Sequence, residues 1–410
     1  MAPRSLLLLA SVSVSSPGFA MTEIAGVDEA LAANVRQYLG EPPCDAGANV
    51  VRRYARTLPD EVRPALEAFG YYRARIEALR EDRAEDCWRV ALTIETGEPV
   101  EVRSVGVALD GAATRDDAMT ALIAEFPLAR GEPLHHGPYL EFKSRVAALA
   151  RERGYLDAAF SRERIDVYPD DGAADIELTF DSGDRYAFGD VRFDSATLRA
   201  EILESFVPFA VGEPYDSEAV IRLQRDLNSS GYFVSARVEP RFDAVEDDRI
   251  PLDVTTVPAD PQSSAFGVGF STDDGPRFSY SRDNVRRNRA GHRYELELLL
   301  AQVRQHMTLD YQIPVGNPQR DWLSIRSGVE RQDIDAGVGS VGRIGAHRTR
   351  VGDDWTTTRY LDILVERDAI GGETLRNTLV MPGLSWARSY RDDLVRPREG
   401  HRLSYGVSLD

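Results

Sequence analysis

The last part of the chain, from residue 264 onward, alternates apolar residues with polar or very small ones. This period of two predicts β-strands, because successive side chains of a strand point to opposite faces of its sheet. The 147 residues from 264 to 410 accommodate about nine strands at roughly sixteen residues for a strand and its turn. In the first strand the apolar residues share one parity and the glycines share the other: Phe266, Val268 and Phe270 against Gly267 and Gly269.

Two kinds of sheet fit this alternation. A soluble β-sandwich also alternates, and that alternative stays open. The strands here are long, and many of their non-apolar positions carry Arg, Glu or Asp, as in residues 293–300. Such a face suits the polar lumen of a barrel whose other face lies in lipid. A transmembrane β-barrel is therefore the favoured expectation, with Trp322 and Tyr360 at its membrane interfaces.

The first 263 residues contain a motif that recurs three times. Each copy has apolar residues at helical spacing, then Gly-Tyr, then strands with period two. The glycine suits the left-handed residue that ends a helix. The copies lie 84 and 77 residues apart, a spacing that fits small domains. The motif predicts three tandem α+β domains, in which the following pairs are structural residues: Gly70-Tyr71, Gly154-Tyr155 and Gly231-Tyr232.

These repeats resemble polypeptide-transport-associated (POTRA) domains. Gly97 and Gly183 close the first two repeats, whereas the third has Pro258-Ala259-Asp260 at the equivalent place. The resemblance implies periplasmic modules that offer exposed sheet edges to an unfolded client by strand addition. The expected organisation is a signal peptide at 1–20, POTRA 1 at 21–101, POTRA 2 at 102–186, POTRA 3 at 187–263, and the N-terminal part of an outer-membrane β-barrel at 264–410.

The segment FGVGFSTDDGPRFSYSRDN, followed by RAGHRYELEL, resembles the opening barrel strands of the TamA family, the translocation and assembly module subunits. Three POTRA repeats fit this family better than its relatives, since general barrel-assembly proteins have more and two-partner secretion transporters have fewer. The resemblance implies that the chain holds about nine of sixteen barrel strands. A segment at 396–403 is similar to a strand-opening motif of the same superfamily, with Glu399 inserted.

The same resemblance implies a function in inserting or translocating autotransporters and other outer-membrane proteins. Phe266, Gly267, Val268, Gly269 and Phe270 would form one side of a lateral seam, where client strands template on an open edge. It also implies an inner-membrane-anchored, TamB-like partner. Two-partner secretion, general barrel assembly and a passive surface-antigen barrel remain the alternatives.

The N-terminus and the two cysteines indicate an exported protein. Residues 1–20 combine Arg4, a short apolar run and small residues at the end, as secretory signal peptides do. Cys44 and Cys87 both fall in the first expected domain, where an oxidising compartment favours a disulfide between them. Two separate buried thiols are the alternative. The net charge of −18 argues against nucleic acid as a partner.

No motif indicates an enzyme, a cofactor or a metal site. Residues 337–342 match the glycine spacing of dinucleotide-binding loops, but no apolar helix follows them. His135 and His136 are adjacent, lack other ligands at metal-binding spacing and are expected in a solvated loop. No nucleophile elbow or zinc-protease motif occurs. We therefore expect a non-enzymatic protein with no catalytic, cofactor-binding or metal-binding residues.

Overall fold

The computed structural model describes residues 19–80, 87–272, 275–334, 337–370, 373–392, 396 and 398–409. The predicted signal peptide lies almost wholly outside these residues, as does part of the 396–403 motif. The described chain forms two compact units, divided between Arg185 and Tyr186. No helix among the described residues is both long enough and apolar enough to cross a membrane.

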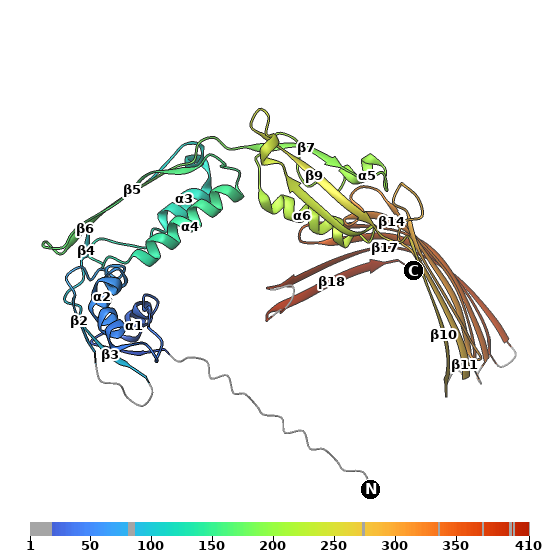
Figure 1. The fold of residues 1–410 in the computed structure, drawn as a ribbon. Helices are drawn as coiled ribbons and strands as arrows, with labels where there is room; N and C mark the ends of the chain where they lie inside the picture. Colours follow the sequence, from blue (N-terminus) through green and yellow to red (C-terminus); the bar gives the residue numbers. More distant parts are fainter. Residues whose placement is uncertain are drawn as a thin grey trace, which may run out of the picture. The chain divides into compact units, whose positions relative to one another are not determined.

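The first domain packs two helices against a three-stranded sheet (Figure 1). The strand order is β1-β3-β2, with β1 parallel and β2 antiparallel to the central β3. Val51, Leu58 and Val62 lie on one side of the long helix, in the same core cluster as Val90 and Leu92 of β3. The elements are β1 (Met21–Ala25), α1 (Glu29–Arg36), α2 (Ala48–Glu67), β2 (Arg75–Arg80) and β3 (Arg89–Glu95).

The second domain repeats this architecture with the strand order β4-β6-β5. Its central strand alternates buried and partly exposed residues, and Ile176, Leu178 and Phe180 enter a core with Phe142 and Val146 of α4. The elements are β4 (Glu101–Asp110), η1 (Ala112–Arg115), α3 (Asp117–Ala124), α4 (His136–Glu152), β5 (Ala159–Tyr168) and β6 (Ala173–Asp181).

The third domain belongs to the second compact unit and has the strand order β7-β9-β8. Ile250, Leu252 and Val254 of its central strand are buried, as are Leu223 and Leu227 of α6. The elements are β7 (Ala187–Phe193), α5 (Ala200–Glu204), α6 (Ser217–Ser229), β8 (Phe233–Pro240), η2 (Phe242–Ala244) and β9 (Arg249–Pro258).

The antiparallel hairpin that follows each Gly-Tyr pair agrees with the sequence prediction. The sequence did not reveal the parallel first strand of each domain. In β4, Val102 is fully buried near the start of the strand, and Val107 and Leu109 are partly buried near its end. A bulge between Val102 and Ser104 changes which alternate residues face the core, so one period of two does not run along the whole strand.

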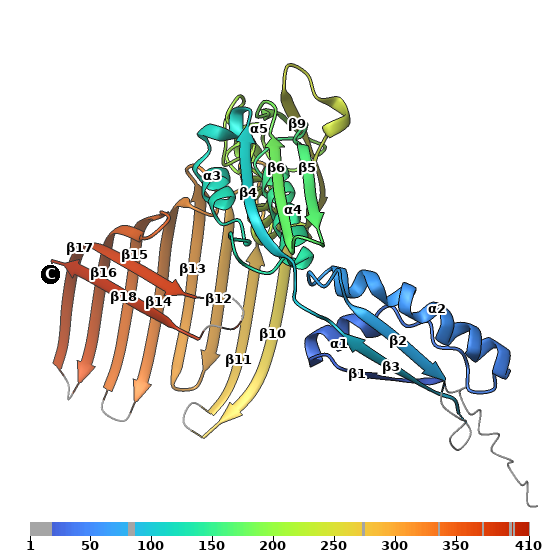
Figure 2. The ribbon, with the colours of Figure 1, turned by 90° about the vertical axis from the view of Figure 1, so that its left-hand side faces the viewer.

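The remaining strands form one antiparallel sheet of nine strands within the described residues, in which neighbours in sequence are neighbours in space (Figure 2). The strand count agrees with the sequence-based expectation. The strands are β10 (Gln262–Ser271), β11 (Gly275–Asn284), β12 (Arg293–Ala301), β13 (Arg304–Pro314), β14 (Asp321–Ile334), β15 (Gly337–Val351), β16 (Thr356–Ile370), β17 (Glu373–Arg391) and β18 (Gly400–Ser408).

Candidate functional sites at open sheet edges

The first strand of the large sheet, β10, has one free edge. Within the described part of the chain it is hydrogen-bonded to β11 alone, from the pair Gln262–Asn284 to the pair Ser271–Gly275. All five residues predicted for the seam lie on this strand. The side chains of Phe266, Val268 and Phe270 are exposed by 73%, 87% and 75%. Three large apolar side chains beside a row of unpaired peptide groups are the features of an edge that accepts another strand.

The two seam glycines lie on the other face of β10, beneath bulky neighbours. A Cβ built at Gly269 would meet Arg277 at 3.0 Å, and one built at Gly267 would meet the Ser279 hydroxyl. Both contacts come from β11, the strand that pairs with β10. The glycines therefore make room for the side chains of the next strand and leave the free edge unobstructed.

The sheet is also open at its other side. Among the strands that the structure describes, β18 pairs with β17 alone, from the pair Gly383–Ser408 to the pair Arg391–Gly400, and β10 and β18 are not paired with each other. Every residue of β18 is exposed. The described sheet therefore presents two edges, one on the strand that follows the third domain and one on β18.

Each small sheet has one edge that is partly covered. A Gly-Glu-Pro turn lies against the start of the parallel strand: the Gly131 N–H donates to the Val102 carbonyl, and the Val102 N–H donates to the Glu132 carbonyl, both at 2.8 Å. In the third domain, Phe188 exchanges the same two bonds with residues 212–213. The tripeptide occurs at residues 40–42, 131–133 and 212–214, so each of the three small domains contains it. In the structure it covers part of an edge that would otherwise be free.

The opposite edge of each small sheet is formed by β2, β5 or β8, each of which pairs only with the central strand among the residues that the structure describes. These strands carry large exposed apolar residues, with Leu79 exposed by 67% and Val234 by 71%. In β8 the side chains of Asn228 and Gln224 from α6 hydrogen-bond the peptide groups of Ala236 and the N–H of Val238. The edges of β2 and β5 are therefore the second set of candidate client-binding edges.

The three Gly-Tyr pairs share a backbone conformation but differ in what the tyrosine contacts. Gly70, Gly154 and Gly231 have φ values of 86°, 86° and 78°, which only glycine adopts without strain. Tyr71 is partly exposed. Tyr155 and Tyr232 are buried, and each donates a hydrogen bond from its hydroxyl to a distant group.

Tyr155 takes part in a charged cluster of the second domain. Its hydroxyl donates to the carboxylate of Asp116 at 3.2 Å, and the Nε of Arg153 donates to the same oxygen at 2.6 Å. Arg185 approaches that oxygen at 3.5 Å. Burial raises the pKa of Asp116, but the charge of Arg153 and the hydrogen bonds from Arg153, Tyr155 and the Ala118 N–H together lower it by more, so the net shift is downward. The cluster holds the first turn of α3 to the end of α4.

Tyr232 connects the third domain to the large sheet. Its hydroxyl donates to the Gly291 carbonyl at 2.5 Å, within the turn between β11 and β12. The Ser205 hydroxyl reaches the Gly316 carbonyl at 3.3 Å, in the turn between β13 and β14. These turns therefore lie at the end of the sheet that adjoins the third domain, here called the proximal end. The opposite end, with the β12–β13, β14–β15 and β16–β17 turns, is the distal end.

Two other sequence predictions concern the first compact unit. Cys44 and Cys87 are joined by a disulfide that closes a loop across 43 residues. The expectation of a solvated loop at His135-His136 is wrong, because α4 begins there. His135 accepts a hydrogen bond from the Gly137 N–H at 3.1 Å as the N-cap, and the ring of His136 bonds the Tyr72 hydroxyl at 2.8 Å. Burial lowers the pKa of both histidines.

Comparison with family models identifies two of the three small domains. Residues 21–96 match the model of POTRA domain TamA domain 1. Residues 186–258 match the POTRA model described as surface antigen variable number repeat. The second domain has the same sheet topology as these two. The predicted fold class, α+β POTRA domains followed by an antiparallel barrel-type sheet, is confirmed.

Comparison with solved structures extends the likeness to the large sheet. BamA from Haemophilus ducreyi lacking POTRA domains 1–3 matches with a TM-score of 0.57 at 13% identity, covering 75% of this chain and 64% of that chain. CdiB from Escherichia coli matches with a TM-score of 0.46 at 14% identity, covering 88% of this chain and 67% of that chain. The chain thus spans slightly less than two thirds of the BamA structure.

Omp85-type proteins that join POTRA domains to a barrel are outer-membrane proteins, and their POTRA domains lie in the periplasm. The likeness to BamA shows the fold of such a barrel in the large sheet. The chain is therefore TamA-like in its first domain, and it joins POTRA domains to a sheet with the fold of an Omp85-superfamily barrel.

Proposed function

We propose that the chain belongs to a non-enzymatic outer-membrane assembly factor that helps to insert or translocate autotransporters and other outer-membrane proteins. Its POTRA domains would stand in the periplasm and receive unfolded clients, and its large sheet would lie in the outer membrane. The free edge of β10 is the observation that carries this proposal. A client strand that pairs with this edge gains main-chain hydrogen bonds whatever its sequence. Folding of the client in the membrane supplies the free energy for its insertion.

The test is disulfide crosslinking between the β10 edge and a client. Ser264→Cys places a thiol on the free edge, and Ser327→Cys is the matched control. Both serines lie in the same cross-strand row of the sheet, but Ser327 is on β14, which has a partner on each side. The client is a nascent outer-membrane protein with one cysteine in a barrel strand. We expect adducts with Ser264→Cys and none with Ser327→Cys.

Two results would contradict the proposal. Adducts of equal yield at both positions would mean that the thiols meet the client at random in the membrane. Absence of adducts at Ser264→Cys, while the client still assembles in the same cells, would favour a passive surface-antigen barrel.

We also propose that the first domain receives an inner-membrane-anchored, TamB-like partner through its β2 edge. The match of residues 21–96 to TamA domain 1 and the exposed Leu79 on that edge support this assignment. A photo-crosslinking residue at Leu79 should capture the partner. The same residue at Val50, which is exposed on α2, is the control. Capture at Val50 alone would place the partner on the helical side of the domain.

A further inference from the structure

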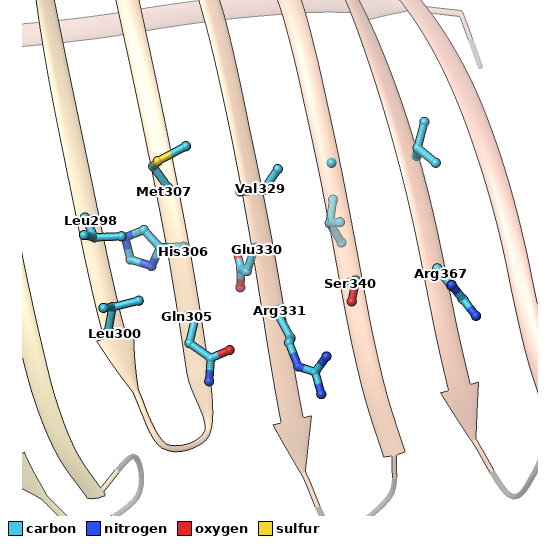
Figure 3. A pocket seen from close by; sticks show the side chains of 13 residues that line it. Leu298, Leu300, Gln305, His306, Met307, Val329, Glu330, Arg331, Ser340 and Arg367 are labelled. Atoms are coloured by element: carbon cyan, nitrogen blue, oxygen red, sulfur yellow. The ribbon is translucent and has the colours of Figure 1, made fainter.

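The face of the large sheet that carries Phe266 and Val268 contains an apolar groove toward the distal end. Its floor is a cross-strand row from β12 to β16, in which Gly342 leaves a gap between large neighbours. A Cβ built at Gly342 would have one neighbour within 4.0 Å, a backbone oxygen of Val365. The groove has a volume of about 510 Å³ (Figure 3). The row consists of Leu298, Met307, Val329, Gly342 and Val365.

The next row toward the distal turns changes from apolar to basic, as Figure 3 shows for Arg331 and Arg367. Directly paired residues on neighbouring strands point to the same face, so this row lies on the same side as the groove. It runs through Leu300, Gln305, Arg331, Ser340, Arg367 and Arg376. We call Arg331, Arg367 and Arg376 the distal arginines.

The distal arginines have little negative charge near them. Arg367 and Arg376 are directly opposite each other on β16 and β17, which places like charges about 5 Å apart at their Cβ atoms and is destabilising. Among the residues that the structure describes, neither forms an ion pair. Arg331 has a single partner, Asp333, at 3.6 Å. An anion bound between these guanidinium groups would offset their repulsion.

The proximal end of the same face is organised differently. Arg348, Arg350 and Arg359 lie there in a comparable cluster, which we call the proximal arginines. Asp321 accepts hydrogen bonds from both Arg348 and Arg350 at about 3.1 to 3.2 Å. Two of the proximal arginines thus have a carboxylate partner within the protein. The distal cluster keeps more positive charge without such a partner, so an external anion would stabilise it more.

The two clusters are separated by most of the thickness of a barrel's apolar band. On β16 the residues that share a face between Arg359 and Arg367 are Leu361, Ile363 and Val365, which are exposed by 46%, 38% and 47%. Eight residues at about 3.3 Å per residue span roughly 26 Å along the strand. A strand tilted by about 40° covers some 20 Å of bilayer over that length, close to the apolar band of about 25 Å in barrels of this kind. If the sheet spans the outer membrane, the distal arginines would lie near the edge of its apolar band, within reach of lipid headgroups.

We propose that the distal arginines bind the phosphate groups of an acylated glycolipid in the outer leaflet, with one acyl chain in the apolar groove. The proposal rests on the proposed function, because the distal turns face the cell exterior only if the third domain is periplasmic. A phosphorylated glycolipid supplies both an anion for Arg367 and Arg376, which form no ion pair among the described residues, and the hydrocarbon that fits the groove. An inner-leaflet phospholipid would meet the proximal arginines instead.

The test is lipid binding by the full chain in detergent micelles, measured by native mass spectrometry. The probes are diphosphoryl lipid A and its fully dephosphorylated form. We expect the triple variant Arg331→Gln, Arg367→Gln, Arg376→Gln to bind diphosphoryl lipid A at least tenfold more weakly than the unmodified chain. The matched control, Arg348→Gln, Arg350→Gln, Arg359→Gln, should remain within twofold. Dephosphorylated lipid A should bind both variants equally and weakly.

The groove is tested by Gly342→Leu, which fills the gap and keeps every arginine. This variant should bind diphosphoryl lipid A severalfold more weakly than the unmodified chain. In a separate competition experiment on the unmodified chain, inorganic pyrophosphate should displace the lipid poorly, because it has no acyl chain to fill the groove. Equal loss in the distal and proximal triple variants would overturn the proposal, as would undiminished binding in the distal triple variant. Ser264→Cys is also introduced into the distal triple variant, and its crosslinking to clients is measured. Crosslinking that persists while lipid binding is lost shows that the proposed function does not depend on the lipid site, so the two proposals can fail independently.

Discussion

Removal of one hydroxyl group at Tyr232 should loosen the connection between the third domain and the large sheet. The Tyr232 side chain is fully buried, and its hydroxyl donates to the Gly291 carbonyl at 2.5 Å. Burial raises the pKa of Tyr232 although Arg293 nearby opposes the shift, so the hydroxyl keeps its proton and remains a donor. Tyr232→Phe retains the ring and removes only the donor.

The cost follows from the group that is left without a partner. A buried carbonyl that loses its donor costs about 1 to 3 kcal/mol, because it cannot regain a bond to water. The equilibrium constant for opening of the 285–292 turn should therefore increase about 5- to 150-fold, since each 1.4 kcal/mol corresponds to about a tenfold change in an equilibrium constant. The third domain should keep its own core, because the phenyl ring still packs against Phe206.

Hydrogen–deuterium exchange of the full chain measures this opening directly. Amides in the turn, such as that of Gly291, which donates to the Asn288 carbonyl at 3.1 Å, should exchange faster in Tyr232→Phe by the factor above. Tyr71→Phe is the matched control, because it makes the same change in the same motif where the tyrosine is partly exposed. Unchanged exchange in Tyr232→Phe, or the same increase in both variants, would refute the reasoning.

Two further predictions concern the first compact unit. Asp116→Asn preserves the helix cap to Ala118 but removes the charge that Arg153 pairs with, and we expect a loss of about 2 to 3 kcal/mol at pH 7 in urea unfolding. Because the folded-state pKa of Asp116 is lowered, its contribution is present above the unfolded-state pKa and is lost as the pH falls through the folded-state pKa. The difference between Asp116→Asn and the unmodified chain should then shrink, and a constant difference would contradict this. Reduction of the Cys44–Cys87 bond, which spans 43 residues, should destabilise the first domain by about 4 kcal/mol on loop entropy. Proteolysis in the presence of a reductant should accelerate cleavage of this domain alone, and equal acceleration in the second domain would argue against the loop-entropy explanation.

Much of the architecture was predictable because it depends on short-range patterns. Alternation along residues 264–410 predicted an antiparallel sheet, and the number of strands followed from the length available. The parallel strands β1, β4 and β7 escaped prediction, because β1 has only five residues and bulges in β4 and β7 interrupt the period of two. His135 and His136 were placed in a loop for a similar reason, because nothing local showed that the ring of His136 bonds Tyr72, 64 residues away.

The Gly-Tyr pairs show where prediction from the sequence ends. A glycine at the end of each helix follows from local backbone geometry, since a positive φ is strained for any residue with a Cβ, and the sequence alone determined Gly70, Gly154 and Gly231. The partners of the tyrosines were decided only by the tertiary structure. Tyr155 meets Asp116, 39 residues away, and Tyr232 meets Gly291, 59 residues away. A hydroxyl bonds whatever the fold brings within hydrogen-bonding distance, and no pattern within the motif specifies it.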